Sequence, residues 1–349
     1  MRTNITTILG CLLMGTGVTH AATQQRSPLD IRHAYLVTGA QTAIISETDQ
    51  ILCRYPRSTR DGFVLKSGNV LLVLNSGKNY PGGVVEVTQT GRTIFQYRGQ
   101  QQVVNSAQRL PGNLTLIAEG GEQPQIIIVN ALGQTQRRIP VATQAEDPKT
   151  QISFARAAAP GRILVTLPAD RRIREYNLEG KILWEWIAPQ RPAYAVRLPN
   201  GHILANLRGD RLVEITRAGK IAWQLTPKDF TEPYLNALSS FQVLSNGNLV
   251  LATATPDAKV SRLMEFTRDK NSSGLPANRT ASRRANFTFS PPTANPAPAR
   301  FCARPFPPFS FTEHPLEAKN SGHEYPFPDR DHVRPEPYRL VGMQQKIRN

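Results

Sequence analysis

The chain repeats one hairpin sequence at a regular interval, and this repeat limits what it can fold into. The clearest copies read VVEVTQTGRTIFQY at Val84–Tyr97, REYNLEGKILWEW at Arg174–Trp186 and LVEITRAGKIAWQL at Leu212–Leu225. Two degenerate copies occupy Ala43–Tyr55 and Ile126–Ile139. Each copy is an apolar strand, a tight turn centred on glycine or a polar residue, and a second strand, which predicts an antiparallel hairpin.

A sixth copy begins at RLMEFTRDK and then loses the pattern. The six turn centres are Asp49, Gly91, Gly133, Gly180, Gly219 and Lys270. Successive centres are 42, 42, 47, 39 and 51 residues apart. A period of about 40–50 residues with several short strands per repeat is typical of β-propeller blades.

A second hairpin signal falls once in each period, out of phase with the first. It is a small-residue turn followed by an apolar strand, as in LKSGNVLLV or LPNGHILAN. Its glycines are Gly68, Gly112, Gly161, Gly201 and Gly247. Two hairpins per unit predict a four-stranded blade. We therefore expect an all-β fold: a β-propeller of about six four-stranded blades with an incomplete last blade, or seven blades in an intact form.

The N-terminal segment is predicted to be a secretory signal peptide covering residues 1–22. It has a basic residue at Arg2, an apolar stretch from Ile8 to Val18, and small residues at its end. No later segment reaches the roughly 18 apolar residues that a membrane span needs. We expect an exported protein, periplasmic or extracellular, with a lead-in at 23–33 and the propeller at 34–270.

The formal charge of +16 is large, and the isoelectric point is about 10.2. In a cytosolic protein such a charge would indicate nucleic acid as a partner. Because export is expected and no basic block is present, we predict no nucleic-acid binding. The cationic surface is expected to attract anionic envelope polymers or lipids.

After processing, Cys53 and Cys302 remain. Cys53 lies four residues past its turn centre, where other units carry a large ring, so we expect a buried free thiol that packs as a small hydrophobe. A disulfide with Cys302 is the alternative. No CxxC pair and no Cys/His cluster at zinc spacing is present in the sequence, and we expect no metal and no cofactor.

Residues 271–349 differ in composition from the repeats, holding 13 of the 28 prolines. Proline removes a hydrogen-bond donor and is excluded from central strands. This Pro-rich tail is either a native disordered segment or the product of a reading frame shifted near Lys270. The break falls inside a hairpin, which favours the frameshift.

At the strands that follow the Gly turns, the chain resembles the quinoprotein-type (PQQ-like) propeller repeats, whose blades end in Gly-Lys-x-x-Trp. Gly180–Trp184 and Gly219–Trp223 match that motif fully, and Gly91–Phe95 matches it conservatively. The resemblance implies that the ring docks between neighbouring blades. The corresponding positions are Cys53, Phe95, Arg137, Trp184 and Trp223. Some similarity to arylsulfotransferase-type propellers is also present.

The sequence does not match the functional residues of either of these two enzyme families. The vicinal cysteine pair of the PQQ-dependent dehydrogenases has no counterpart, and their calcium ligands have no match. The sulfotransferases need an active-site histidine, and before the tail the mature chain offers His33 and His202 alone. We expect His202 to be an outer turn residue.

Four units carry glutamate five residues before the turn centre: Glu86, Glu175, Glu214 and Glu265. Either these carboxylates form an acidic ring in the channel, or they lie on a solvated strand face. The second interpretation pairs them with cross-strand basic residues such as Arg92, Lys181 and Lys220, and we favour it.

The strands that enter the second set of turns are predicted to be innermost and to line the channel. Near its mouth they would present Arg60, Asp61, Asn105, Arg156, Tyr194, Arg197 and Gln242. The three arginines are candidates to hold an anionic ligand. The alternative is ordinary channel lining bonded to backbone and water.

The sequence thus predicts a non-catalytic binding or interaction module of the cell envelope. Its partner would be an envelope protein or an anionic small molecule or polymer. The alternative is a propeller enzyme of arylsulfotransferase or quinoprotein type.

Overall fold

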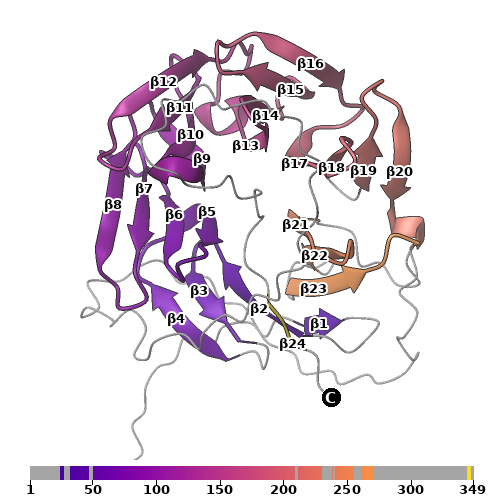
Figure 1. Ribbon diagram of the computed structural model, residues 1–349, viewed down its shortest axis with the longest axis horizontal. Helices are drawn as coiled ribbons and strands as arrows, with labels where there is room; N and C mark the ends of the chain where they lie inside the picture. Colours follow the sequence, from indigo (N-terminus) through magenta and orange to yellow (C-terminus); the bar gives the residue numbers. More distant parts are fainter. Residues whose placement is uncertain are drawn as a thin grey trace, which may run out of the picture.

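Six four-stranded sheets form a ring around a central axis (Figure 1). The computed structural model describes residues 24–26, 32–46, 50–208, 211–229, 238, 240–254, 261–269 and 344–346. Within each sheet the strands follow one another antiparallel, apart from the β1–β23 pair, which is parallel. The expectation of an all-β, six-bladed propeller is confirmed.

Four blades are each built from one uninterrupted segment. Blade 2 contains β5 (Thr59–Val64), β6 (Val70–Leu74), β7 (Gly83–Val87) and β8 (Thr93–Arg98). Blade 3 contains β9 (Val103–Arg109), β10 (Thr115–Gly120), β11 (Gln125–Val129) and β12 (Thr135–Pro140). Blade 4 contains β13 (Phe154–Ala159), β14 (Arg162–Leu167), β15 (Arg172–Asn177) and β16 (Ile182–Ile187). Blade 5 contains β17 (Pro192–Arg197), β18 (Ile203–Leu207), β19 (Arg211–Ile215) and β20 (Ile221–Leu225).

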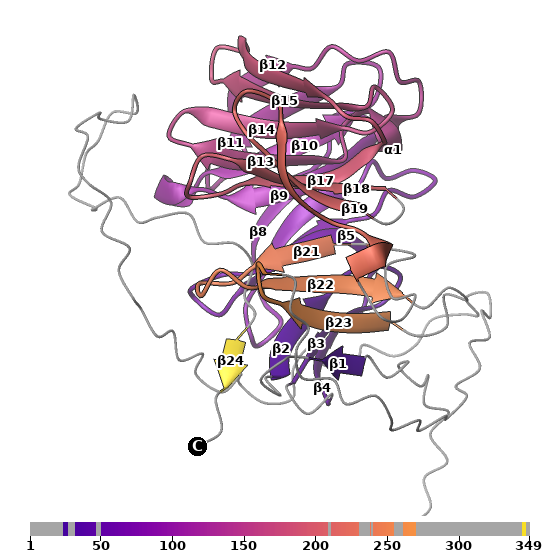
Figure 2. The same cartoon turned by 90° about the vertical axis from the view of Figure 1, so that its right-hand side faces the viewer.

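Blades 1 and 6 are completed by strands from the two ends of the chain. Blade 1 contains β24 (Gln344–Lys346), β2 (Arg32–Val37), β3 (Thr42–Ile45) and β4 (Ile51–Tyr55). Blade 6 contains β21 (Ser240–Val243), β22 (Leu249–Ala254), β23 (Ser261–Phe266) and β1 (Gln24–Arg26). The two blades lie side by side and close the ring (Figures 1 and 2).

The expected lead-in at 23–33 therefore supplies β1 and the start of β2. The predicted signal peptide and nearly all of the Pro-rich tail lie outside the described residues. Within the tail, the backbone of β24 is described and pairs with β2. Whether the rest of the tail is disordered, or frameshifted, stays a prediction.

Burial along the strands explains their composition. The second and third strands of a blade lie between two neighbouring blades, and β6 (VLLVL) and β11 (QIIIV) are buried at every position. The outermost strand meets solvent on one face, so β8 (TIFQYR) alternates, with only Phe95 and Tyr97 buried. Continuous apolar runs and alternating runs thus mark inner and outer strands.

The core consists of six apolar layers, one between each pair of neighbouring blades. The layer between blades 3 and 4, for example, joins Ile126 and Ile128 to Ile163 and Val165. The layer between blades 1 and 6 joins Ile45 to Val250 and completes the circle. A blade on its own has no core, because each of its faces is covered only by a neighbour.

The two ends of the ring differ in their connections. The short glycine turns lie at one end, here the turn end, and the longer links lie at the other, the loop end. Glycine is required in these turns because the backbone is left-handed there, as at Gly91 (φ 85°) and Gly201 (φ 82°). The longest described link joins blades 3 and 4 and contains α1 (Pro148–Gln151). Two single-turn 3-10 helices cover Pro111–Asn113 and Pro227–Asp229.

Candidate functional site

A buried ion pair between Asp61 and Arg156 lies at the centre of the ring. Asp61 is on β5 of blade 2 and Arg156 is on β13 of blade 4. Arg156 Nη2 donates to Asp61 Oδ1 at 3.0 Å and to Oδ2 at 2.8 Å. Both side chains are less than 10% exposed. The pair therefore connects two blades that are not neighbours in the ring.

Backbone amides complete the hydrogen bonding of the Asp61 carboxylate. The amide of Gly62 donates to Oδ1 at 3.0 Å, and the amide of Ala107 on β9 donates to Oδ2 at 3.2 Å. Ala107 belongs to blade 3, so Asp61 holds the open edge of that blade's innermost strand. A carboxylate taken out of water needs such donors to offset its lost hydration.

Aromatic rings surround the Arg156 guanidinium. Its central carbon lies 4.9 Å from the ring centres of Phe63 and Phe154, and 5.3 Å from that of Tyr194. These distances are within the range of cation–π attraction. Tyr194 in turn packs against Phe241 of blade 6, with ring centres 5.0 Å apart. Blades 2, 4, 5 and 6 thus meet in one cluster on the axis.

Burial shifts the pKa of each ionisable group in this cluster. Burial lowers the pKa of Arg156, but Asp61 and Tyr194 together outweigh that effect and raise it overall, so the guanidinium remains charged. Burial raises the pKa of Asp61, and Arg156 opposes that rise. Burial raises the pKa of the Tyr194 hydroxyl, and Arg156 opposes that rise. Because Arg156 and Asp61 neutralise each other, neither presents a free charge to a ligand.

Other innermost side chains join neighbouring blades in the same way as Asp61. The hydroxyl of Ser106 accepts from the Ala155 amide at 3.0 Å, and Gln108 Oε1 accepts from the Ala157 amide at 2.9 Å. The hydroxyl of Ser153 donates to Ala193 O at 2.8 Å. These bonds satisfy the exposed edges of the innermost strands.

Asn105 and Arg60 hold the α1 link over the loop end. Asn105 Nδ2 donates to Pro148 O at 2.9 Å, and Arg60 Nη2 donates to Lys149 O at 3.3 Å. Burial lowers the pKa of Arg60, and nearby Asp147 and Asp61 oppose that change. Asn105 Oδ1 is buried without a hydrogen-bond partner among the described residues.

The structure brings Asp61, Arg156 and Tyr194 together, but it does not bring the three arginines together. Arg60 is the second residue of β5, near the loop end, whereas Arg197 is the last residue of β17, at the turn end. Arg197 forms an ion pair with Glu175. Gln242 lies on β21, opposite Val250, and is half-buried. An anion site made of Arg60, Arg156 and Arg197 is therefore inconsistent with this arrangement.

The repeated glutamates are buried at the turn end, so the interpretation that they lie on a solvated face is wrong. Glu86, Glu175, Glu214 and Glu265 are each at most 8% exposed. Their partners come from the hairpin turn of the same blade and from the next blade. Glu86 accepts from Asn69 Nδ2 at 2.7 Å and pairs with Arg109 of blade 3.

The other glutamates also take their partners from the hairpin turn of their own blade or from the next blade. Glu214 accepts from Asn200 Nδ2 at 3.1 Å, contacts His202 Nδ1 at 2.7 Å and pairs with Arg268 of blade 6. Glu265 accepts from Asn248 Nδ2 at 2.7 Å. The expected partners Arg92, Lys181 and Lys220 form no ion pair with these glutamates among the described residues. His202 is a turn residue bonded to a structural carboxylate.

The large rings on the outermost strands also bind the next blade. Trp184 Nε1 donates to Arg217 O at 2.8 Å, and Trp223 Nε1 donates to Arg268 O at 3.0 Å. The guanidinium of Arg268 lies 4.5 Å from the Trp223 ring centre, and that of Arg109 lies 4.6 Å from the Phe95 ring centre. In contrast, Arg137 is exposed on β12.

Glutamate and ring are direct cross-strand neighbours, as in the pairs Glu86–Phe95, Glu175–Trp184 and Glu214–Trp223. A basic residue of the next blade contacts both of them. We call this unit the inter-blade clasp. Sequence analysis missed its arginines because they lie in the following repeat. The signal was an arginine at the end of the next innermost strand (Arg109, Arg197) or in the next outer hairpin turn (Arg217, Arg268).

Cys53 differs from the expectation of a free thiol: it is in a disulfide bond, so that interpretation is wrong. Both other cysteines, Cys11 and Cys302, lie outside the described residues. The pairing was not visible in the repeat because either partner is far away in the sequence. Cys53 is 4% exposed and stands opposite Ile44.

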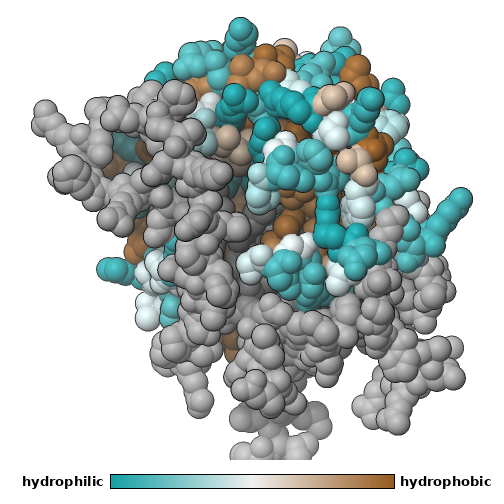
Figure 3. Space-filling view, turned by 45° about the vertical axis from the view of Figure 1, so that its right-hand side comes forward, coloured by the Kyte–Doolittle hydropathy of each residue, from teal (hydrophilic) through white to brown (hydrophobic). Residues whose placement is uncertain are grey.

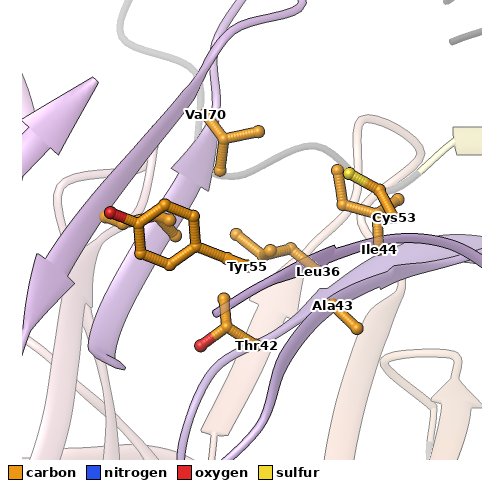
Figure 4. A pocket seen from close by; sticks show the side chains of 8 residues that line it. Leu36, Thr42, Ala43, Ile44, Cys53, Tyr55 and Val70 are labelled. Carbon is orange, nitrogen blue, oxygen red and sulfur yellow. The ribbon is translucent and has the colours of Figure 1, made fainter. Parts of the chain in front are cut away.

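A small pocket lies beside Cys53 between blades 1 and 2 (Figure 4). Its lining is mostly apolar and includes Leu36, Ile44, Tyr55 and Val70. Its cavity volume is about 10 Å³, about what a single water molecule needs. A cysteine is smaller than the rings of the other blades, and the pocket lies where such a ring would pack.

At the loop end, two arginines share one tyrosine ring, a cluster that sequence analysis did not identify. The guanidinium carbons of Arg57 and Arg98 lie 4.8 Å and 5.4 Å from the Tyr80 ring centre. Arg98 also donates to Asn79 O at 3.2 Å. Arg57, Lys78 and Arg98 are exposed. We call these three basic residues and Tyr80 the Tyr80 cluster.

The exposed charges are strongly unbalanced. Fifteen basic and six acidic residues of the described chain are exposed. The basic residues at the loop end are Arg57, Lys78, Arg98, Lys149, Arg171, Arg191, Arg208 and Lys228. The acidic ones there are Glu122, Glu146 and Asp147. On the side seen in Figure 3, hydrophilic side chains cover much of the described surface, with apolar ones between them.

The described residues contain no group of three or more histidine, cysteine or acidic side chains placed to hold a metal ion. In the same part of the chain, no helix has the length and apolar character needed to cross a bilayer.

The sequence matches no family model and no curated protein. A solved protein of unknown function from Bacteroides caccae has a TM-score of 0.57 and 23% identity, covering 65% of this chain and 84% of that chain. This similarity supports the propeller fold alone. Streptogramin B lyase (TM-score 0.47, 11% identity, 74% and 84% covered) and the WD40 domain of Doa1 (0.46, 12%, 66% and 89%) are also structural neighbours. PQQ-like membership remains a prediction.

Breaking the axial ion pair should destabilise the protein strongly. Arg156→Met or Asp61→Asn alone leaves a buried group without its partner, and each should cost about 3–5 kcal/mol of unfolding free energy. The double variant should cost less than the sum of the two. Urea unfolding curves measure all three, and additive costs would contradict a direct interaction.

The clasp predicts a graded response at Trp223. Trp223→Ala should cost about 3 kcal/mol, because a half-buried ring is lost. Trp223→Phe keeps a ring but loses the bond to Arg268 O, and should cost about 1 kcal/mol. Arg137→Ala, at the equivalent position of blade 3, should change stability by less than about 0.5 kcal/mol. Equal shifts of the urea midpoint would refute the blade alignment.

Proposed function

We propose that the protein is an exported, non-catalytic β-propeller that binds an anionic polymer of the cell envelope at its loop end. The observation that carries this proposal is the Tyr80 cluster. Two guanidinium groups converge on one ring, and neither has an acidic partner among the described residues. Their charge is available to a ligand, unlike that of Arg156.

An anionic polymer suits this surface for two reasons. Guanidinium groups bind carboxylates and phosphates through two parallel hydrogen bonds, and a nearby ring restricts their orientation. The remaining basic residues of the loop end extend the positive potential around the rim, which favours a repeated charge over a single one. Lys149 and Lys228 belong to this extended surface.

Binding rather than catalysis is favoured by the state of the axial residues. A general base needs a free lone pair within reach of a substrate proton. The Asp61 carboxylate is instead occupied by Arg156 and two backbone amides and is buried. The buried carboxylate on the axis therefore has a structural role.

Export is supported by the sequence of residues 1–22 and by the state of Cys53. Disulfide bonds persist in the periplasm and outside the cell, and they are rare in the cytosol. Cys53 is in such a bond. The charge of +16 supports the proposal that the exported protein stays at the cell envelope.

Binding of fluorescent poly-glutamate to the purified protein tests the site. We expect the dissociation constant to rise with salt concentration, because the attraction is electrostatic. The triple variant Arg57→Gln, Lys78→Gln, Arg98→Gln should weaken binding about tenfold or more, which corresponds to about 1.4 kcal/mol.

The matched control is Arg92→Gln, Lys181→Gln, Lys220→Gln, which removes the same charge at the turn end. It should retain most of the binding. Equal losses in both triple variants would mean unspecific attraction to a cationic protein, and the loop-end site would have to be abandoned. Sulfate transfer or PQQ-dependent dye reduction by the protein would contradict the non-catalytic assignment.

Export is tested separately by the mature N-terminus. The protein isolated from the periplasm or medium should begin after Ala22, as measured by intact mass and N-terminal peptide sequencing. A full-length chain that retains Met1 and stays in the cytosol would contradict export.

A further inference from the structure

Glu175 is surrounded by three arginines at the turn end, between blades 4 and 5. Its Oε1 accepts from Arg162 Nη1 at 2.9 Å and contacts Arg217 Nη1 at 3.2 Å. Its Oε2 accepts from Arg197 Nη1. The glutamate side chain is fully buried, so one carboxylate supports three guanidinium groups.

This set differs from the other inter-blade clasps. Glu86 has one arginine and an asparagine, and Glu214 has one arginine, an asparagine and a histidine. In blade 4, Arg162 replaces the turn asparagine that accompanies the other glutamates, such as Asn69 of blade 2. One arginine is sufficient to join two blades, so two of the three are surplus to that role.

Three arginines and one glutamate leave a local net charge of +2. The acidic residue of the adjacent turn, Glu179, forms no ion pair with these arginines among the described residues. Three like charges around one carboxylate repel one another, and the repulsion is relieved by a further anion or by solvent. Lys181 in the same turn adds to the positive potential.

The arginines are held in place and remain accessible. The side chains of Arg162 and Arg217 are each 42% exposed, and that of Arg197 is 18% exposed. Arg217 is positioned by Trp184, whose Nε1 bonds to its carbonyl and whose ring centre lies 5.8 Å from its guanidinium. A guanidinium carries five N–H donors, and the contacts with Glu175 use one nitrogen of each arginine.

We propose that Arg162, Arg197 and Arg217 form a binding site for a doubly charged tetrahedral oxyanion, a phosphate or sulfate group. Such a group balances the charge of +2 and has enough oxygens to accept from all three guanidinium groups. A carboxylate balances half of that charge. The site is at the opposite end of the ring from the Tyr80 cluster and does not depend on it.

Titration calorimetry of the full protein with inorganic phosphate at pH 7.5 and low salt tests the site. We expect saturable binding at one site and a higher melting temperature in phosphate, since a ligand of the folded state stabilises it. The double variant Arg162→Asn, Arg217→Gln restores the Glu86 pattern and keeps the Arg197–Glu175 pair, so it should fold. It should bind phosphate at least tenfold more weakly.

The matched control, Lys66→Gln, Arg92→Gln, removes two charges from turn-end hairpins of blade 2 and should bind phosphate as the wild type does. Sulfate should compete and acetate should not. Glycerol phosphate binding as well as phosphate would show that the group can belong to a larger molecule, and weaker binding would indicate the free ion. No saturable binding at millimolar phosphate, an equal loss in the control, or competition by acetate would each overturn the proposal.

Discussion

The ion pair between Asp61 and Arg156 is the contact on which the centre of the ring depends. Removing two charges from water costs more than their attraction returns unless every donor and acceptor is used well. Here two backbone amides, three aromatic rings and the pair itself share that task; Arg156 Nε alone of the pair's polar atoms has no hydrogen-bond partner among the described residues. Because blade 3 lies between the paired blades and donates one of the amides, three consecutive blades have a fixed relation to one another. An apolar axis would fill the same space without fixing which blade faces which.

Toward the outside of the ring, the inter-blade clasps fix how neighbouring blades lie relative to one another. Each clasp joins a buried carboxylate and a ring of one blade to an arginine of the next, above an apolar layer that supplies most of the burial energy. Polar contacts are thus concentrated at the axis and at the turn end, while the apolar layers lie between. At the loop end, several cationic side chains have no acidic partner among the described residues, which suits that end to recognition.

The sequence was sufficient to predict the propeller, its four-stranded blades and the rings of the outermost strands, because these depend on local period and turn chemistry; it left six and seven blades open. It did not reveal the arginine partners of the glutamates, since Glu86 and Arg109 belong to different repeats and meet only after the blades pack. The proposed convergence of Arg60, Arg156 and Arg197 failed for a geometric reason. They occupy the second, third and last positions of their strands, so they lie at different heights along the axis. The disulfide of Cys53 depends on a long-range contact that no local pattern encodes.

The clasps limit how blades can be duplicated, deleted or exchanged in such a ring. Glu86 is matched by Arg109 in the following blade, whereas Ile44 lies in one apolar layer with Val64 of the following blade. A duplicated, deleted or transplanted blade would set a carboxylate against an aliphatic side chain, or an arginine against isoleucine, in a layer closed to water. Successive blades are therefore not interchangeable parts. The contacting side chains at each boundary between blades determine which blade can follow which. Recombination can therefore exchange two adjoining blades only as a pair, with their contacting side chains kept together.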